Sequence, residues 1–147
     1  MIQTITEDEL KQIVAGTPTP HHQLAFMLGF YQCLPISDII KLKPEDLDYG
    51  RKVIRIDNRE IKIQNQVKKY LRHLPIPCGI RSLEIAFKAI SRRVLNKDTS
   101  FRTLRRSGAL WHLNAGTSIW DVQLYLGHSS IDNTKRLAKV GEDINAI

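Results

Sequence analysis

Hydrophobic residues recur at helical spacing along most of the chain and alternate with polar residues in one short stretch. The alternation from Val53 to Ile63, interrupted at Asp57-Asn58, predicts a β-hairpin, and a third strand is expected from His73 to Ile76. Capping residues, prolines and glycines bound the helical runs. Helices are expected within residues 6–16, 20–34, 36–42, 83–94, 100–115 and 119–126, and one more starting at Ser129 or Ser130.

This pattern predicts a mainly α-helical fold with a small antiparallel β-sheet. The chain has 147 residues, of which 42% are hydrophobic and 25% are charged. That length suits one domain with a substantial core, so we expect a single domain over residues 1–147.

Neither a membrane segment nor a metal or cofactor site is expected from the sequence. No apolar run approaches the roughly 18 residues of a membrane helix, and the N-terminus, MIQTITEDEL, lacks the features of a signal peptide, so a cytoplasmic location is expected. Cys33 and Cys78 lie far apart and outside any CxxC or Cys/His spacing. This arrangement indicates neither a zinc site nor a disulfide framework.

The chain is basic. It has 22 Lys and Arg against 15 Asp and Glu, a formal net charge of +7 and a pI near 9.6. Such a balance favours a polyanionic partner, although composition alone does not decide the question, because many basic proteins bind no nucleic acid. The positions of the charges carry more information.

A first basic cluster follows the predicted hairpin. It comprises Lys62, Lys68, Lys69 and Arg72 in the segment KIQNQVKKYLRH, which contains no acidic residue. The sequence supports two interpretations of this segment equally well. The segment is either a loop that contacts a phosphate backbone and releases counterions, or a solvated surface loop.

A second cluster lies on the helix FRTLRRSGALWH and comprises Arg102, Arg105 and Arg106. The residues Leu104, Gly108, Trp111 and Ala115 share one face of this helix. An arginine at the edge of such a buried stripe is preorganised, and its planar guanidinium can bind two phosphate oxygens. The alternative is a surface group without a specific role.

A third feature is the turn Leu126-Gly127-His128-Ser129-Ser130. The glycine permits a tight turn, and His128 is then presented beside the start of the next helix. A histidine there can donate to a phosphate or exchange protons, although a lone histidine is more often structural.

The forty residues from Phe101 to Val140 resemble the C-terminal half of a tyrosine recombinase (phage integrase) catalytic domain. That family has a His-x-Leu-Arg helix, a helix that ends in glycine, and a Leu-Gly-His turn ahead of its nucleophilic tyrosine. Upstream, the segment from Cys33 to Leu42 resembles the family's Gly-Leu-Arg-Ile-Ser-Glu segment, and the hairpin falls where the family has a three-stranded sheet. The resemblance spans nearly the whole chain, but it leaves no separate N-terminal core-binding domain.

The resemblance assigns roles to several residues. In this family a tyrosine attacks a phosphodiester, two arginines hold the charged transition state, and a lysine and histidines move protons. By position, Arg105 corresponds to the second arginine, His128 to the late histidine and Asp38 to an early acidic residue. Lys68 or Lys69 corresponds to the lysine between strands.

Other positions depart from the family pattern. The first arginine falls on Pro35, and the histidine of His-x-Leu-Arg falls on Arg102. The tyrosine is expected nine residues after His128, where the chain has Leu137. Leucine cannot attack a phosphate and proline cannot hold an anion, so the resemblance implies a degenerate recombinase domain that lacks cleavage activity.

The sequence therefore favours a non-catalytic protein that binds double-stranded DNA, as a transcriptional regulator or as an accessory factor of a plasmid or phage. One alternative is an active strand-transferase or relaxase that uses a non-standard tyrosine such as Tyr125. Another is a protein-interaction module, which would have basic residues scattered evenly over its surface. A homo-oligomer through the segment from Val140 to Ile147 is also expected. The expected DNA-binding residues are Lys62, Lys68, Lys69, Arg72, Arg102, Arg105, Arg106, His128, Lys135 and Arg136.

Overall fold

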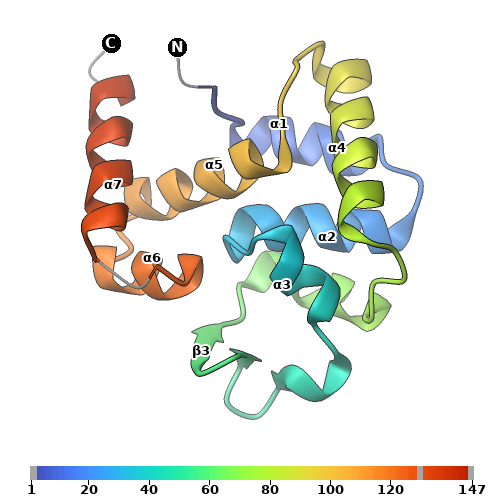
Figure 1. The fold of residues 1–147 in the computed structure, drawn as a ribbon, viewed down its shortest axis with the longest axis horizontal. Helices are drawn as coiled ribbons and strands as arrows, with labels where there is room; N and C mark the ends of the chain where they lie inside the picture. Colours follow the sequence, from blue (N-terminus) through green and yellow to red (C-terminus); the bar gives the residue numbers. More distant parts are fainter. Residues whose placement is uncertain (1–2, 129–130, 146–147) are drawn as a thin grey trace.

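The fold combines α-helices with one three-stranded antiparallel sheet, as Figure 1 shows. The computed structural model describes residues 3–128 and 131–145, with side chains described as far as residue 139. The helices are α1 (Glu7–Ala15), α2 (Pro20–Tyr31), α3 (Ile36–Lys41), α4 (Ile80–Leu95), α5 (Phe101–Asn114), α6 (Ile119–Leu126), α7 (Ile131–Asn145) and the 3₁₀ segments η1 (Pro44–Asp46) and η2 (Asn65–His73). The strands are β1 (Leu47–Asp48), β2 (Val53–Ile56) and β3 (Arg59–Lys62). The expected fold class is confirmed.

Local capping signals set several helix ends. The Thr6 hydroxyl accepts from the Glu9 backbone N–H at 3.1 Å, and the Glu9 carboxylate accepts from the Thr6 N–H at 3.0 Å, forming the predicted capping box. Ser100 and Ser118 cap α5 and α6 by accepting from the backbone N–H groups of Thr103 and Asp121, whereas Thr19 makes no side-chain cap bond at α2. The predicted helix start at residues 129–130 lies outside the described residues.

The sheet has the order β1-β2-β3, and its outer strand is not the one that the sequence predicts. Ile54 of β2 pairs with Leu47 on one side and with Ile61 on the other, so the predicted hairpin is confirmed. The expected strand from His73 to Ile76 is wrong, because His73 ends η2 and the rest lies in a loop. Leu74 and Ile76 are buried in the core instead, and Pro75 between them offers no N–H to a sheet.

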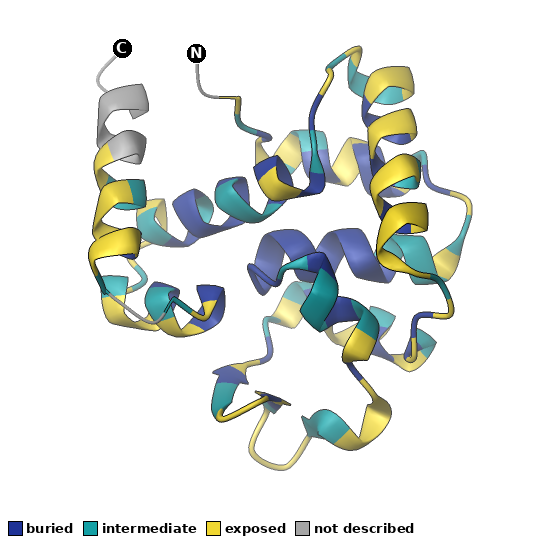
Figure 2. Cartoon of the chain, viewed as in Figure 1, coloured by how far each residue is buried: buried dark blue, intermediate teal, exposed yellow. Residues whose placement is uncertain are grey.

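Helices α2 and α5 form the centre of the molecule. Every residue of α2 from Leu24 to Tyr31 is buried, which explains its apolar character on all sides (Figure 2). Helix α5 packs closely against it at Gly108, where a Cβ atom would lie only 1.7 Å from the Phe30 carbonyl oxygen. Helix α4 is amphipathic and buries Leu83, Phe87 and Ile90 against this centre.

None of the helices in the described part of the chain has both the length and the apolar character of a membrane span.

Candidate nucleic-acid interface

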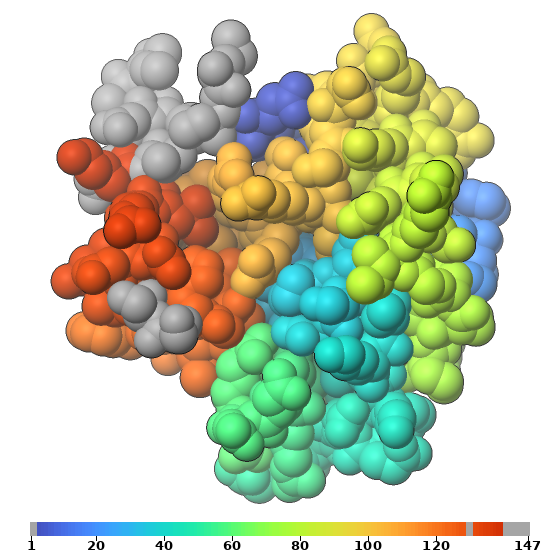
Figure 3. Space-filling model, viewed as in Figure 1, coloured from blue at the N-terminus to red at the C-terminus, as the bar shows by residue number. Residues whose placement is uncertain are grey.

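An open pocket lies where α5, the α6–α7 turn and α7 meet. Figure 3 shows these helices and the hairpin together on one face of the molecule. The pocket has a volume of about 560 Å³ and is lined by Arg102, Arg105, Arg106, Leu126, His128, Asn133, Arg136 and Leu137. Among the described residues, no aspartate or glutamate lines it. The pocket therefore presents concentrated positive charge to an anionic ligand.

Arg105 is held by backbone carbonyls from two other elements. Its Nε–H donates to the Cys33 carbonyl at 2.9 Å, just beyond α2, and an Nη2–H donates to the Leu126 carbonyl at the end of α6. These bonds engage two of the three guanidinium nitrogens and leave further N–H donors for a ligand in the pocket. Burial lowers the pKa of Arg105, but an arginine remains charged at neutral pH. The side chain is therefore preorganised, as its place beside the buried stripe predicts.

His128 lines the same pocket and is oriented by a buried threonine. Its Nδ1 atom lies 2.8 Å from the hydroxyl of Thr134, which is fully buried on α7. Burial and the nearby Arg105 guanidinium both lower the pKa of His128. The imidazole is therefore neutral at pH 7, and it can exchange a hydrogen bond with a phosphate without adding charge.

Arg59, which the sequence analysis missed, lies beside these groups. It begins β3, and its guanidinium lies 3.2 Å from the Asp38 carboxylate on α3, with about 18% of each side chain exposed. Among the described residues, its buried Nε has no hydrogen-bond partner. Gly127 ends α6 with φ +72°, and a Cβ there would lie 2.8 Å from the Arg59 guanidinium carbon. The left-handed backbone, which L side chains rarely adopt, favours a glycine at this turn, and the close approach of Arg59 adds to that preference.

Asp38, which the resemblance assigns to an early acidic position, is paired with Arg59. Only one sequence signal marks Arg59: it directly follows the hairpin turn at Asp57-Asn58. Its partners come from distant parts of the chain, so spacing alone could not identify it.

The remaining predicted residues near the pocket differ in exposure. Arg102 is exposed and Arg106 is half-buried on α5, and both line the pocket. Arg136 on α7 is exposed, lines the pocket and donates to Asn133 at 3.3 Å. Lys135 is exposed on α7 but is not among the lining residues. His112 turns inward from α5 and contacts the Tyr31 carbonyl at 2.6 Å.

The first basic cluster lies elsewhere. Lys68 and Lys69 lie on η2 and line a separate pocket with residues of α1 and α2, which shares no residue with the arginine pocket. Arg72 bonds back to the Lys69 carbonyl at 3.0 Å, and Lys62 is exposed at the end of β3. The structure does not bring the two predicted clusters into one pocket.

The assignment of Lys68 or Lys69 to a lysine between strands is wrong. Strands β2 and β3 are joined directly through Asp57-Asn58, and the whole of η2 follows the sheet. The lysines therefore cannot project from the turn between strands.

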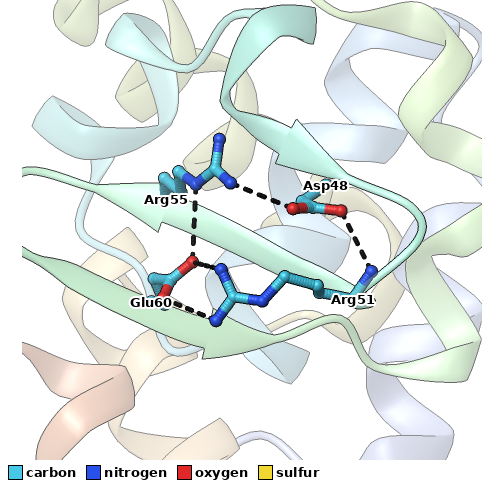
Figure 4. A network of polar contacts seen from close by, with 4 residues as sticks. All are labelled: Asp48, Arg51, Arg55 and Glu60. Atoms are coloured by element: carbon cyan, nitrogen blue, oxygen red, sulfur yellow. Dashed lines mark hydrogen bonds and ion pairs between the residues drawn. The ribbon is translucent and has the colours of Figure 1, made fainter.

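Arg51, in the turn before β2, and Arg55, on β2, differ from the arginines of the pocket because acids on neighbouring strands pair with them. Figure 4 shows Arg51 bonded to both carboxylate oxygens of Glu60, at 2.7 and 2.9 Å. Arg55 bonds to Asp48 at 2.9 Å and to Glu60 at 3.4 Å. Positive charge is thus neutralised around the hairpin, whereas the described residues that line the arginine pocket include no acid.

Two positions that the resemblance assigns to cleavage chemistry, those of the tyrosine and of the first arginine, have no reactive group. Leu137 is half-buried, packs against the core and lines the arginine pocket. Pro35 precedes α3 as its N-cap and has no N–H. Tyr125 is only 7% exposed, lies against His112 with ring centroids 5.1 Å apart, and is not among the lining residues of the pocket. Burial raises the pKa of Tyr125, with Asp121 adding to the effect.

The described residues include one group of potential metal ligands that the sequence did not indicate. His21, His22 and Cys78 lie together at the first turn of α2. Local spacing could not reveal this group, because the cysteine is carried by a loop remote in sequence.

No family model matches this sequence, and no curated protein matches it at a significant level. Solved structures do match. A crystal structure of XerA recombinase is 18% identical, with a TM-score of 0.78, and the match covers 94% of this chain and 61% of that one. The Tn1549 transposon integrase in complex with circular intermediate DNA is 17% identical, with a TM-score of 0.78 and coverage of 93% and 61%.

A further match is XerH site-specific recombinase bound to its palindromic difH substrate in a post-cleavage complex. It is 13% identical, with a TM-score of 0.78, and the match covers 97% of this chain and 51% of that one. The chain thus spans about three fifths of these structures or less. At this identity the comparison concerns the fold, which is that of the tyrosine recombinase catalytic domain.

Proposed function

We propose that this chain is a non-catalytic DNA-binding protein with a tyrosine recombinase fold. Its role would be that of a transcriptional regulator or an accessory factor of a mobile element such as a plasmid or phage. The observation that carries the proposal is the pocket of four arginines and His128, which has no acid among its described lining residues and in which Leu137 stands at the expected tyrosine position.

The chemistry of the pocket suits a phosphate backbone. Arginine guanidinium groups form paired hydrogen bonds to phosphate oxygens, and each neutralised phosphate releases counterions. Arg105 is rigid because two carbonyls hold it, whereas Arg102 and Arg136 are exposed and can follow the path of a strand. The Tn1549 and XerH structures contain DNA, which supports DNA as the partner for this fold.

The uneven distribution of charge favours DNA binding over a protein-interaction module. Such a module predicts evenly scattered basic residues, but Arg51 and Arg55 form ion pairs with acids, whereas no acidic residue is among the described residues that line the arginine pocket. The expected oligomerisation segment, Val140 to Ile147, lies outside the residues whose side chains are described, so a homo-oligomer stays a proposal.

The absence of cleavage follows from the side chains at the reactive positions. Leucine has no oxygen with which to form a phosphodiester link to DNA, and Pro35 supplies no positive charge to a transition state. The alternative nucleophile Tyr125 is disfavoured because its side chain is buried against His112.

One reaction, analysed on two gels, tests this proposal. The full chain is incubated at low salt with a nicked duplex that traps covalent intermediates, and the sample is run on a native and on a denaturing gel. We expect a shifted band on the native gel and no covalent adduct on the denaturing gel. Tyr125→Phe serves as a matched variant and should behave like the wild type.

Two outcomes contradict the proposal. Failure to shift any duplex at low salt would remove the DNA-binding role. A covalent adduct that disappears in Tyr125→Phe would establish the strand-transferase alternative.

A further inference from the structure

Two histidines and a cysteine meet at the end of α2 that is remote from the arginine pocket. His21 and His22 lie in the first turn of α2, and Cys78 lies in the loop between η2 and α4. Their ligand atoms, one from each side chain, all lie within 4.8 Å of one another. All three residues are half-buried, so their side chains are partly packed but open to an ion from solvent.

We propose that His21, His22 and Cys78 form a Zn²⁺-binding site. Two imidazole nitrogens and one thiolate are ligands that Zn²⁺ prefers, and the group has no carboxylate that would favour Mg²⁺ or Ca²⁺. Three protein ligands leave one tetrahedral position, which a water molecule fills from the exposed side.

The spacing of the ligand atoms is close to what the ion requires. Bond lengths of about 2.0–2.1 Å to nitrogen and about 2.3 Å to sulfur place tetrahedral ligand atoms roughly 3.4–3.6 Å apart. The observed upper limit of 4.8 Å therefore needs side-chain movements of only about 1 Å. Half-buried side chains in a first helical turn and in a loop can make such movements without disturbing the core.

Packing already positions part of the site. The rings of His21 and His22 meet edge to face, with centroids 4.7 Å apart, and the His22 ring stacks on Phe26 with centroids 6.1 Å apart. Phe26 is itself fully buried in the core. The two imidazoles are thus held near each other, and Cys78 approaches them from a separate segment.

The location indicates a structural role for the ion. The arginine pocket is built against the other end of α2, where the Cys33 carbonyl binds Arg105. From His22 to Tyr31 the helix rises roughly 14 Å, so an ion at the first turn contacts none of the arginines. The ion would instead fix the loop before α4 to the start of α2. The loop and the start of α2 lie side by side in Figure 1.

Titration with Co²⁺, a spectroscopic substitute for Zn²⁺, tests the site on the full chain. We expect one ion per chain, a thiolate-to-cobalt charge-transfer band, and loss of the band when Zn²⁺ displaces Co²⁺. Cys78→Ser should abolish the band. His21→Ala and His22→Ala should each weaken binding by at least roughly 100-fold, since even outer-shell changes cost about 10–100-fold.

His73→Ala is the matched control, because His73 is also half-buried but lies outside the cluster. It should bind Co²⁺ as the wild type does. A charge-transfer band that persists in Cys78→Ser, or a wild-type protein that gives no band, would overturn the proposal.

A second measurement uses only the wild-type protein, so its result does not depend on whether a variant folds. Cys33 is fully buried, and burial raises its pKa to about 12, so an alkylating reagent should react with the native protein at Cys78. We expect one equivalent of Zn²⁺ to slow alkylation of Cys78 by about tenfold or more, because a metal-bound thiolate is less reactive. Unchanged alkylation in the presence of Zn²⁺ would refute the site. DNA binding should be the same with and without Zn²⁺, so the two proposals fail separately.

Discussion

Arg105 has two physical roles that can be separated by experiment. Its guanidinium joins the end of α2 to the end of α6 through the Cys33 and Leu126 carbonyls, and it also lines the pocket. A lysine in its place would keep the charge but could not reproduce the planar arrangement of donors. At the scale of single residues, the Arg105 side chain therefore contributes both to the stability of the fold and to ligand binding.

Arg105→Ala should lower the free energy of unfolding by about 1.5–3 kcal/mol for each carbonyl bond lost, and it should also weaken DNA binding. Arg102→Ala should weaken DNA binding alone, because Arg102 is exposed. Chemical denaturation and fluorescence anisotropy on the same samples measure the two effects. Unchanged stability in Arg105→Ala would contradict the structural role.

Buried histidines predict a dependence of stability on pH. Burial lowers the pKa of His112, which is 2% exposed, and also contributes to lower pKa values for His22 and His128. The unfolded chain then binds more protons than the native one below about pH 6.5. Stability should be fully present above that pH and should decline as the pH falls towards the lowered native pKa values.

Denaturation midpoints measured between about pH 8 and pH 5 should therefore fall with pH, and His112→Gln should have a smaller slope. The opposite sign, or an unchanged slope in His112→Gln, would show that His112 is not buried in its neutral form.

The packing of α2 against α5 is the feature of the fold that tolerates least change. Gly108 allows α5 to contact the Phe30 backbone, where a Cβ would lie 1.7 Å from the carbonyl oxygen. Backbone atoms cannot move aside as a flexible side chain can. The two helices would have to separate to admit even one methyl group.

Gly108→Ala should therefore lower the free energy of unfolding by about 1–3 kcal/mol or prevent folding altogether. Gly79→Ala is the matched control, because a Cβ at Gly79 has no neighbour within 4 Å among the described residues. Thermal unfolding followed by circular dichroism compares the two variants. Equal midpoints would contradict the close approach of α5 to α2.

Elements whose ends or pairing are set by residues close together in the sequence were predictable. Elements that form only through contacts with residues remote in the sequence were not. The capping box at Thr6, the serine caps and the alternation in the hairpin each act within a few residues. The strand Leu47–Asp48 has only two residues and forms because β2 offers it an edge. In the site, Arg105 and His128 were predictable from one helix and one turn, whereas Arg59 depends on Asp38 and Gly127, which are remote in sequence.

Across the whole molecule, the basic residues fall into groups with different surroundings. Arg51 and Arg55 are paired with acids, and the lysines of η2 line their own pocket. The arginines of α5 and α7 share a pocket that no acid lines in the part of the chain that the structure describes. The net charge of +7 is therefore less informative than its distribution. Only the last group combines rigid and exposed arginines in one pocket.

The salt dependence of duplex binding tests this distribution most directly. Each phosphate contact contributes a slope of about −0.9 to a plot of log K against log salt concentration. Arg102→Ala combined with Arg106→Ala should therefore make the slope less negative by about 2, whereas Arg51→Ala combined with Arg55→Ala should leave it unchanged. Equal slopes for the wild type and the pocket variant, or a larger effect of the hairpin variant, would contradict the assignment of DNA binding to the arginine pocket.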